Sequence, residues 1–132
     1  MGGAGEPRVV AVSSDDTLQF TPKVIEASPG ERLHVDLTYT GRLPATVMDH
    51  NWLLLKAGSD INAFAAAAAD AKATEYVPVG LRHQVLAQIG LLGARSSGFV
   101  EFRAPKVPGS YPYLCSYPGH CQGGMNGVLV VK

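Results

Sequence analysis

Three side chains with metal-binding atoms lie close together near the C-terminus, at Cys115, His120 and Met125. Four residues separate each from the next, and glycines and a proline between them allow a tight loop. A loop of this size can curl until its thiol, imidazole and thioether point at one centre. A second imidazole, His50, lies far upstream, so it reaches that centre only if two distant segments fold together. This requirement constrains the fold more than any other feature of the chain.

One thiolate, two imidazoles and a weak thioether are the ligand set of a blue-copper electron-transfer site. Such a site binds one copper ion and leaves no open position for substrate, so the pattern predicts an electron carrier rather than an enzyme. Each residue taken alone has a more ordinary interpretation: a buried free cysteine, an exposed loop histidine and a methionine that fills the core. Their combination, with this spacing in this loop, favours the metal site.

Other sites built from the same residues remain open at this point. Cys121, next to His120, would complete a closed tetrahedral copper or zinc site with His50, Cys115 and His120, suited to metal storage or delivery. If Met125 does not bind, copper would keep an open position, as in a redox enzyme. A Cys115–Cys121 disulfide would close a very short loop and leave no thiolate for a metal.

Hydrophobic periodicity predicts a chain made mostly of β-strands. Residues 32–39 alternate apolar and polar side chains, as a half-buried strand does. Residues 60–74 differ, because they are rich in alanine and have high helix propensity, with Ser59 or Asp60 as N-cap. We therefore predict an all-β, Greek-key sandwich or barrel with one short helical insertion around residues 60–74. Further strands are predicted at residues 9–13, 18–21, 23–27, 47–55, 82–89, 98–103, 111–115 and 128–132.

The charge balance and length of the chain limit what else it can do. The 132 residues carry 11 basic and 11 acidic side chains, so no strongly basic surface for nucleic acid is expected. No segment approaches the roughly 20 apolar residues of a membrane span. We expect a flexible tail or linker remnant at residues 1–7 and one domain at residues 8–132. We also expect a monomer, with membrane contact only through an anchor preceding this sequence.

Two motifs resemble the ligand-bearing segments of the cupredoxins, the type 1 blue copper proteins, and among them those of azurin and the auracyanins. They are Val47-Met-Asp-His-Asn-Trp52 and Cys115-Ser-Tyr-Pro-Gly-His120, and the likeness extends from about residue 9 to residue 132. The resemblance implies the cupredoxin fold and one copper ion held by His50, Cys115 and His120. It also implies Met125 as a weak axial ligand. The backbone oxygen of Asp49 would be a second axial contact, at a position where azurin has glycine.

Residues around these ligands are expected to tune the copper site. The backbone N–H of Asn51 is a candidate donor to the Cys115 sulfur, and its side chain is within reach of Ser116. The N–H of Tyr117 is a second candidate donor. Hydrogen bonds to the sulfur and a dry environment adjust the reduction potential.

Electrons are expected to enter and leave through His120, within an apolar surface that contacts redox proteins transiently. The resemblance implies a periplasmic or other extracytoplasmic location, with or without a membrane tether. We call the expected contact surface the partner patch, and it consists of Leu18, Leu43, Val47, Met48, Pro118 and Gly119, with Tyr117 beside them.

Overall fold

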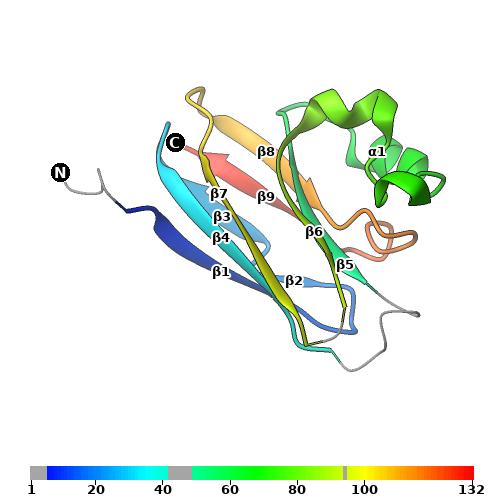
Figure 1. Ribbon diagram of the computed structural model, residues 1–132. Helices are drawn as coiled ribbons and strands as arrows, with labels where there is room; N and C mark the ends of the chain where they lie inside the picture. Colours follow the sequence, from blue (N-terminus) through cyan, green and yellow to red (C-terminus); the bar gives the residue numbers. More distant parts are fainter. Residues whose placement is uncertain (1–5, 42–48, 94) are drawn as a thin grey trace.

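Two β-sheets pack face to face in the computed structural model, which describes residues 6–41, 49–93 and 95–132 (Figure 1). The first sheet has the strand order β2-β1-β4-β7 and the second β3-β9-β8-β5-β6. The strands are β1 (Arg8–Ser14), β2 (Phe20–Thr21), β3 (Val24–Ala27), β4 (Arg32–Tyr39), β5 (His50–Leu55), β6 (Val85–Leu92), β7 (Ser97–Arg103), β8 (Gly109–Leu114) and β9 (Asn126–Val131). The predicted all-β sandwich is confirmed. Residues 1–5 of the predicted tail lie outside the described part of the chain.

Strands that are distant in sequence are neighbours in both sheets. β1 pairs in parallel with β4, and β3 pairs in parallel with β9. β5 lies between β6 and β8, antiparallel to both. This order places the start of β5, which carries His50, near the end of β8, which leads directly into Cys115. The sheet topology therefore brings the two ligand-bearing segments together.

The core lies between the two sheets and follows the predicted alternation. In β4, Leu33, Val35, Leu37 and Tyr39 are all buried, whereas the side chains between them are only partly covered or exposed. Trp52 of β5 is fully buried in the same core. The period of two in the sequence thus marks which face of β4 meets the opposite sheet.

A helical insertion covers the outer face of β5. It contains α1 (Ile61–Ala68) and the 3₁₀ turns η1 (Lys72–Thr74) and η2 (Val79–Gln84). The Asp60 side chain caps α1, because its Oδ1 accepts the N–H groups of Asn62 and Ala63 at 3.0 Å each. Every residue of β5 is buried, since Leu53 and Leu55 pack against Phe64 of the insertion. Figure 1 shows α1 at the same end as the β8–β9 loop.

The strand predicted at residues 82–89 begins later in the structure. Residues 82–84 form the last part of η2 rather than the start of a strand, and β6 begins at Val85. Pro78 precedes this turn with φ −62°, and the N–H of Leu81 donates to the Pro78 carbonyl at 3.0 Å. The proline thus starts a turn that continues through the residues predicted as the beginning of the strand.

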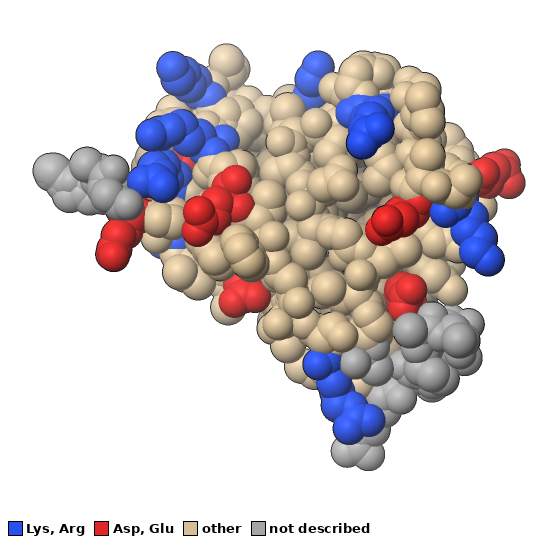
Figure 2. Space-filling model, viewed as in Figure 1, with Lys and Arg blue, Asp and Glu red and all other residues tan. Residues whose placement is uncertain are grey.

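Charged side chains of both signs are interspersed over the face seen in Figure 2, in keeping with the zero formal charge. The His34 side chain on β4 is partly buried, with 21% of its surface exposed. Its ring stacks on Phe99 at 4.7 Å between centroids, and its Nδ1 lies 2.7 Å from Glu101. Within the described residues, no helix has the length and apolar character needed to cross a membrane.

Candidate metal centre

Two imidazoles and one thiol converge in the interior at the loop end of the sandwich. The Nδ1 atoms of His50 and His120 are 3.2 Å apart. The Cys115 Sγ lies 3.5 Å from Nδ1 of His120 and 4.0 Å from Nδ1 of His50. All three residues are buried, and their ligand atoms lie within 4.8 Å of one another. The fold therefore brings together the three side chains that the sequence singles out.

The loop between β8 and β9 is closed by its own backbone. The N–H of Cys115 donates to the Met125 carbonyl, and the N–H of Met125 donates to the His120 carbonyl, both at 3.0 Å. Gly119 and Gly124 have φ of 83° and 106°, values that side chains disfavour. Met125 is fully buried and belongs to the same core cluster as Cys115. Its backbone thus ties the two ends of the loop to each other.

The orientation of the His50 ring follows from the acceptor on its far side. Its Nε2 lies 3.0 Å from the backbone oxygen of Asp15. A carbonyl oxygen can only accept, so Nε2 carries the proton and Nδ1 keeps a lone pair directed at Cys115 and His120. This is the tautomer that can bind a metal through Nδ1.

Burial sets the protonation states of the three groups. It lowers the pKa of His120 to about 4, with a smaller contribution from the neighbouring His50. Burial also lowers the pKa of His50, although the bond to the Asp15 carbonyl acts in the opposite direction. Burial raises the pKa of the Cys115 thiol to about 12, offset only in part by the N–H groups of Asn51 and Tyr117. Without metal, the site holds neutral imidazoles and a neutral thiol, and a bound cation would displace the thiol proton.

Asn51 joins three parts of the fold at this site. Its backbone N–H points at the Cys115 Sγ at 3.5 Å. Its side chain donates to Ser116 Oγ at 2.9 Å and accepts the Ser116 N–H at 2.8 Å. Ser116 Oγ in turn donates to the Tyr76 carbonyl in the helical insertion at 2.6 Å. Sequence reasoning did not identify Tyr76, because nothing in its local pattern shows that the insertion reaches the loop.

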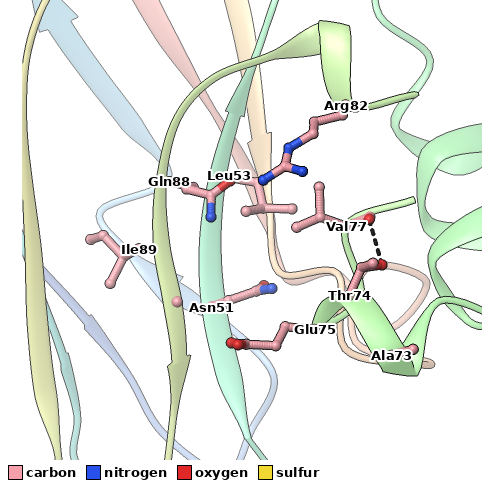
Figure 3. Close-up of a pocket in the computed structure, with 10 residues that line it drawn as sticks. Asn51, Leu53, Ala73, Thr74, Glu75, Val77, Arg82, Gln88 and Ile89 are labelled. Carbon is pink, nitrogen blue, oxygen red and sulfur yellow. Dashed lines mark hydrogen bonds between the residues drawn. The ribbon is translucent and has the colours of Figure 1, made fainter. Parts of the chain in front are cut away.

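A separate cavity of about 260 Å³ lies between the insertion and strands β5 and β6 (Figure 3). Arg82, Gln88, Glu75 and Thr74 contribute polar atoms to its walls, and Asn51 lies at its edge. Thr74 Oγ1 donates to the Val77 carbonyl there, as the dashed line in Figure 3 shows. None of the three convergent ligand residues lines this cavity, so it is distinct from the metal centre.

Cys121 lies outside the convergent group. It is buried against Leu53 and Phe64 in the cluster beneath the insertion, and both cysteines are free thiols. The group of potential metal ligands found in the described residues contains His50, Cys115 and His120 without Cys121. This geometry disfavours the closed tetrahedral site considered above.

We expect Cys121→Ser to leave the visible spectrum of the copper-loaded protein unchanged. It should lower the free energy of unfolding by about 1–2 kcal/mol, because a hydroxyl replaces a thiol in an apolar cluster. Absorption spectra and urea titrations measure the two effects, with Cys121→Ala as a control that adds no hydroxyl. A collapsed spectrum in both variants would place Cys121 among the ligands.

Asp49 and the partner patch are described only in part. Burial raises the pKa of Asp49, and its Oδ1 is a buried atom without a hydrogen-bond partner in the part of the chain that the structure describes. The axial role of its backbone oxygen stays a prediction. Pro118 and Gly119 are exposed, and Leu18 lies against Gly123, where an added Cβ would meet it at 2.9 Å. The patch residues outside the described part are Leu43, Val47 and Met48.

Comparison with known proteins agrees with this arrangement. The family model described as copper binding proteins, plastocyanin/azurin family, matches residues 7–132. Auracyanin-B of Chloroflexus aurantiacus is 41% identical over 120 residues, which cover 90% of this chain and 49% of that protein. The chain thus spans about half the length of this relative. Azurin of Bordetella pertussis is 36% identical over 118 residues, covering 84% of this chain and 75% of that protein.

Solved structures show the same fold. A structure of auracyanin B has a TM-score of 0.82 and 32% identity, and covers 96% of this chain and 91% of its own. A dithionite-reduced auracyanin from Roseiflexus castenholzii has a TM-score of 0.83 and 29% identity, and the match covers 97% of this chain and 99% of that one. Auracyanin A, described as a "blue" copper protein, has a TM-score of 0.82 at 26% identity, and the match covers 96% of this chain and 100% of that one.

Proposed function

Because the chain belongs to the plastocyanin/azurin family of copper-binding proteins, we propose that it is a type 1 blue copper protein carrying single electrons between redox partners. His50, Cys115 and His120 would hold one copper ion, with Met125 as a weak fourth ligand. The observation that carries this proposal is the buried convergence of two Nδ1 atoms and one Sγ within 4.8 Å of one another. When bound, copper supplies one-electron exchange between Cu(I) and Cu(II).

The donor set fits copper better than the alternatives. A soft thiolate with two imidazoles and a thioether is the set that type 1 copper takes, whereas structural zinc takes four strong tetrahedral ligands. The fourth strong ligand for zinc would have to be Cys121, which lies outside the convergent group. Met125 is fully buried in the same core cluster as Cys115, which supports a thioether ligand rather than an open position for substrate.

The chain holds its ligands in place before any metal arrives. His50 sits at the start of a strand buried on both faces, and the loop bearing Cys115 and His120 is closed by backbone hydrogen bonds. Asn51 binds the two segments to each other. Ligands held this firmly move little when the charge at the site changes, which favours fast electron transfer.

The redox partner would approach over His120, a residue that is 5% exposed. The Tyr117 ring lies 4.6 Å from the His120 ring, and the exposed Pro118 and Gly119 with the partly buried Leu18 would add apolar surface suited to a small and transient contact. Family membership supports an extracytoplasmic location, and a site with four protein ligands would suit a carrier rather than an enzyme.

Copper titration of the metal-free protein tests the proposal. We expect one equivalent of Cu(II) to produce an intense absorption at roughly 600 nm, as a copper–thiolate bond does, and a reversible one-electron wave in voltammetry. A colourless protein that binds zinc more tightly would instead indicate metal storage or delivery. A spectrum that changes with small-molecule substrates would indicate an enzyme.

Met125→Leu should keep the copper ion but raise its reduction potential, by on the order of 60 mV, a tenfold shift in the one-electron equilibrium. The reason is that leucine removes the axial ligand and leaves a more apolar, three-coordinate site, which Cu(I) tolerates better than Cu(II) does. Voltammetry measures the shift. Leu129→Met makes the reverse exchange in the same core cluster and should leave the potential unchanged. Loss of the metal from Met125→Leu would mean that the thioether is a strong ligand.

A further inference from the structure

The His50 imidazole is held by contacts from two other segments. On one side, the ring of Tyr39 packs edge-on against it, with 4.1 Å between centroids and 61° between planes. On the other, its Nε2–H donates to the Asp15 carbonyl in the turn that follows β1. Tyr39 is fully buried at the end of β4, so its ring cannot turn toward solvent.

The hydroxyl of Tyr39 links these two contacts. It donates to Asp16 Oδ1 at 2.5 Å, and Asp16 directly follows the residue whose carbonyl accepts from His50. The same turn is tied by the Thr17 N–H to Asp15 Oδ1 at 2.8 Å and by the Thr40 N–H to Ser14 O at 2.8 Å. One tyrosine therefore contacts the imidazole with its ring and holds the turn behind it with its hydroxyl.

Gly41 shows that the chain makes room for this contact. A Cβ at this position would lie 2.2 Å from Asp16 Oδ1 and 2.2 Å from Tyr39 Cε1. Both distances are far below van der Waals contact, so a side chain here would separate Tyr39 from Asp16. The glycine is required by the close approach of these two residues rather than by a turn.

We propose that Tyr39 and Asp16 are positioning residues of the metal centre. Their hydrogen bond holds the Asp15 carbonyl on His50 Nε2, and this keeps the Nδ1 lone pair directed at Cys115. Outer partners of this kind orient a histidine ligand, and their loss weakens metal binding by roughly 10- to 100-fold. The effect on copper rests on the proposed function, whereas the effect on the His50 tautomer is a property of the metal-free chain.

Four variants separate positioning from simple packing. Tyr39→Phe keeps the ring and removes only the hydroxyl, and Asp16→Ala removes the acceptor. Asp16→Asn keeps an oxygen acceptor and serves as the conservative rescue. Tyr111→Phe is the matched control, because Tyr111 is also a buried tyrosine with a hydrogen-bonded hydroxyl. Its acceptor is the Val107 carbonyl, away from His50.

The first measurement is nitrogen-detected NMR of the imidazoles in the metal-free protein. Wild type, Asp16→Asn and Tyr111→Phe should show His50 protonated at Nε2 with slow exchange of that proton. Tyr39→Phe and Asp16→Ala should show faster exchange and a mixture of tautomers. Equal spectra for all variants would overturn the proposal.

The second measurement is the copper dissociation constant, with the electron paramagnetic resonance spectrum recorded alongside. We expect Tyr39→Phe and Asp16→Ala each to raise the constant about tenfold, and the double variant to raise it no further. Tyr111→Phe should lose comparable stability with unchanged copper binding. If both tyrosine variants change stability alike and neither changes copper binding or the spectrum, Tyr39 is only a packing residue.

The two sets of results distinguish failure of this inference from failure of the proposed function. If wild type binds no copper with a thiolate absorption, the proposed function is wrong, and the NMR comparison still decides the role of Tyr39. If wild type binds copper as expected and the NMR spectra do not differ, only the positioning role is wrong.

Discussion

Replacing Cys115 by serine is expected to abolish the intense visible absorption of the copper-loaded protein and to lower copper affinity more than about 100-fold. Serine is close in size, so the buried site keeps its shape. However, its hydroxyl is a hard donor that does not ionise near neutral pH, and the soft sulfur ligand is lost. Absorption spectra and a competition assay with a copper chelator measure the two effects.

The matched control for this variant lies six residues along the same loop. Cys121→Ser makes the same chemical change in another buried cysteine and should keep the absorption. A Cys115→Ser protein that remains blue would show that Cys115 is not a ligand. Loss of colour in both variants, with intact folding, would instead indicate that both thiols bind the metal.

The metal-free protein should lose stability as the pH falls from about 6.5 to 4. The pKa of His120 is about 4 in the folded state and about 6.5 in the unfolded chain, so between these values the unfolded state binds more protons. The free energy of unfolding then rises with pH across this window. The difference of about 2.5 pKa units between the two states corresponds to roughly 3 kcal/mol of unfolding free energy. All of this contribution is lost below pH 4. His50 contributes in the same direction.

Urea titrations of the metal-free protein at pH 7, 5.5 and 4 test this expectation against His120→Gln. That variant cannot gain the proton, so its stability should fall less over the same range, and the difference isolates His120 from the carboxylates. His83→Gln, at an exposed position, controls for the loss of an imidazole as such. Parallel curves for wild type and His120→Gln would show that burial does not hold His120 neutral.

The parts of the fold that were predictable are those in which local pattern and tertiary environment agree. Residues 32–39 alternate because one face meets the opposite sheet, and β4 has these bounds. The alanine-rich segment is helical because alanine has high helix propensity and the Asp60 side chain caps the first turn. Residues 82–84 were mispredicted because no glycine or proline separates them from the strand that follows, whereas Pro78 starts a turn that continues through Gln84.

The sequence by itself determined the chemistry of the centre. A cysteine, a histidine and a methionine at short spacing in a glycine-rich loop define a soft ligand set, and the strand pattern defines a sandwich able to bring His50 to it. Ligand type and hydrophobic periodicity are local properties, so they can be read directly from the order of the residues.

Only the tertiary structure decided how the centre is held. It buried Cys121 beneath the insertion and brought the Tyr76 carbonyl to the Ser116 hydroxyl. It also placed Tyr39 between His50 and Asp16. These contacts join residues that are far apart in the chain, and their partners are chosen by sheet order and packing. Local sequence patterns do not predict which distant residues come into contact, because the same residues would form ordinary strands and turns in another topology.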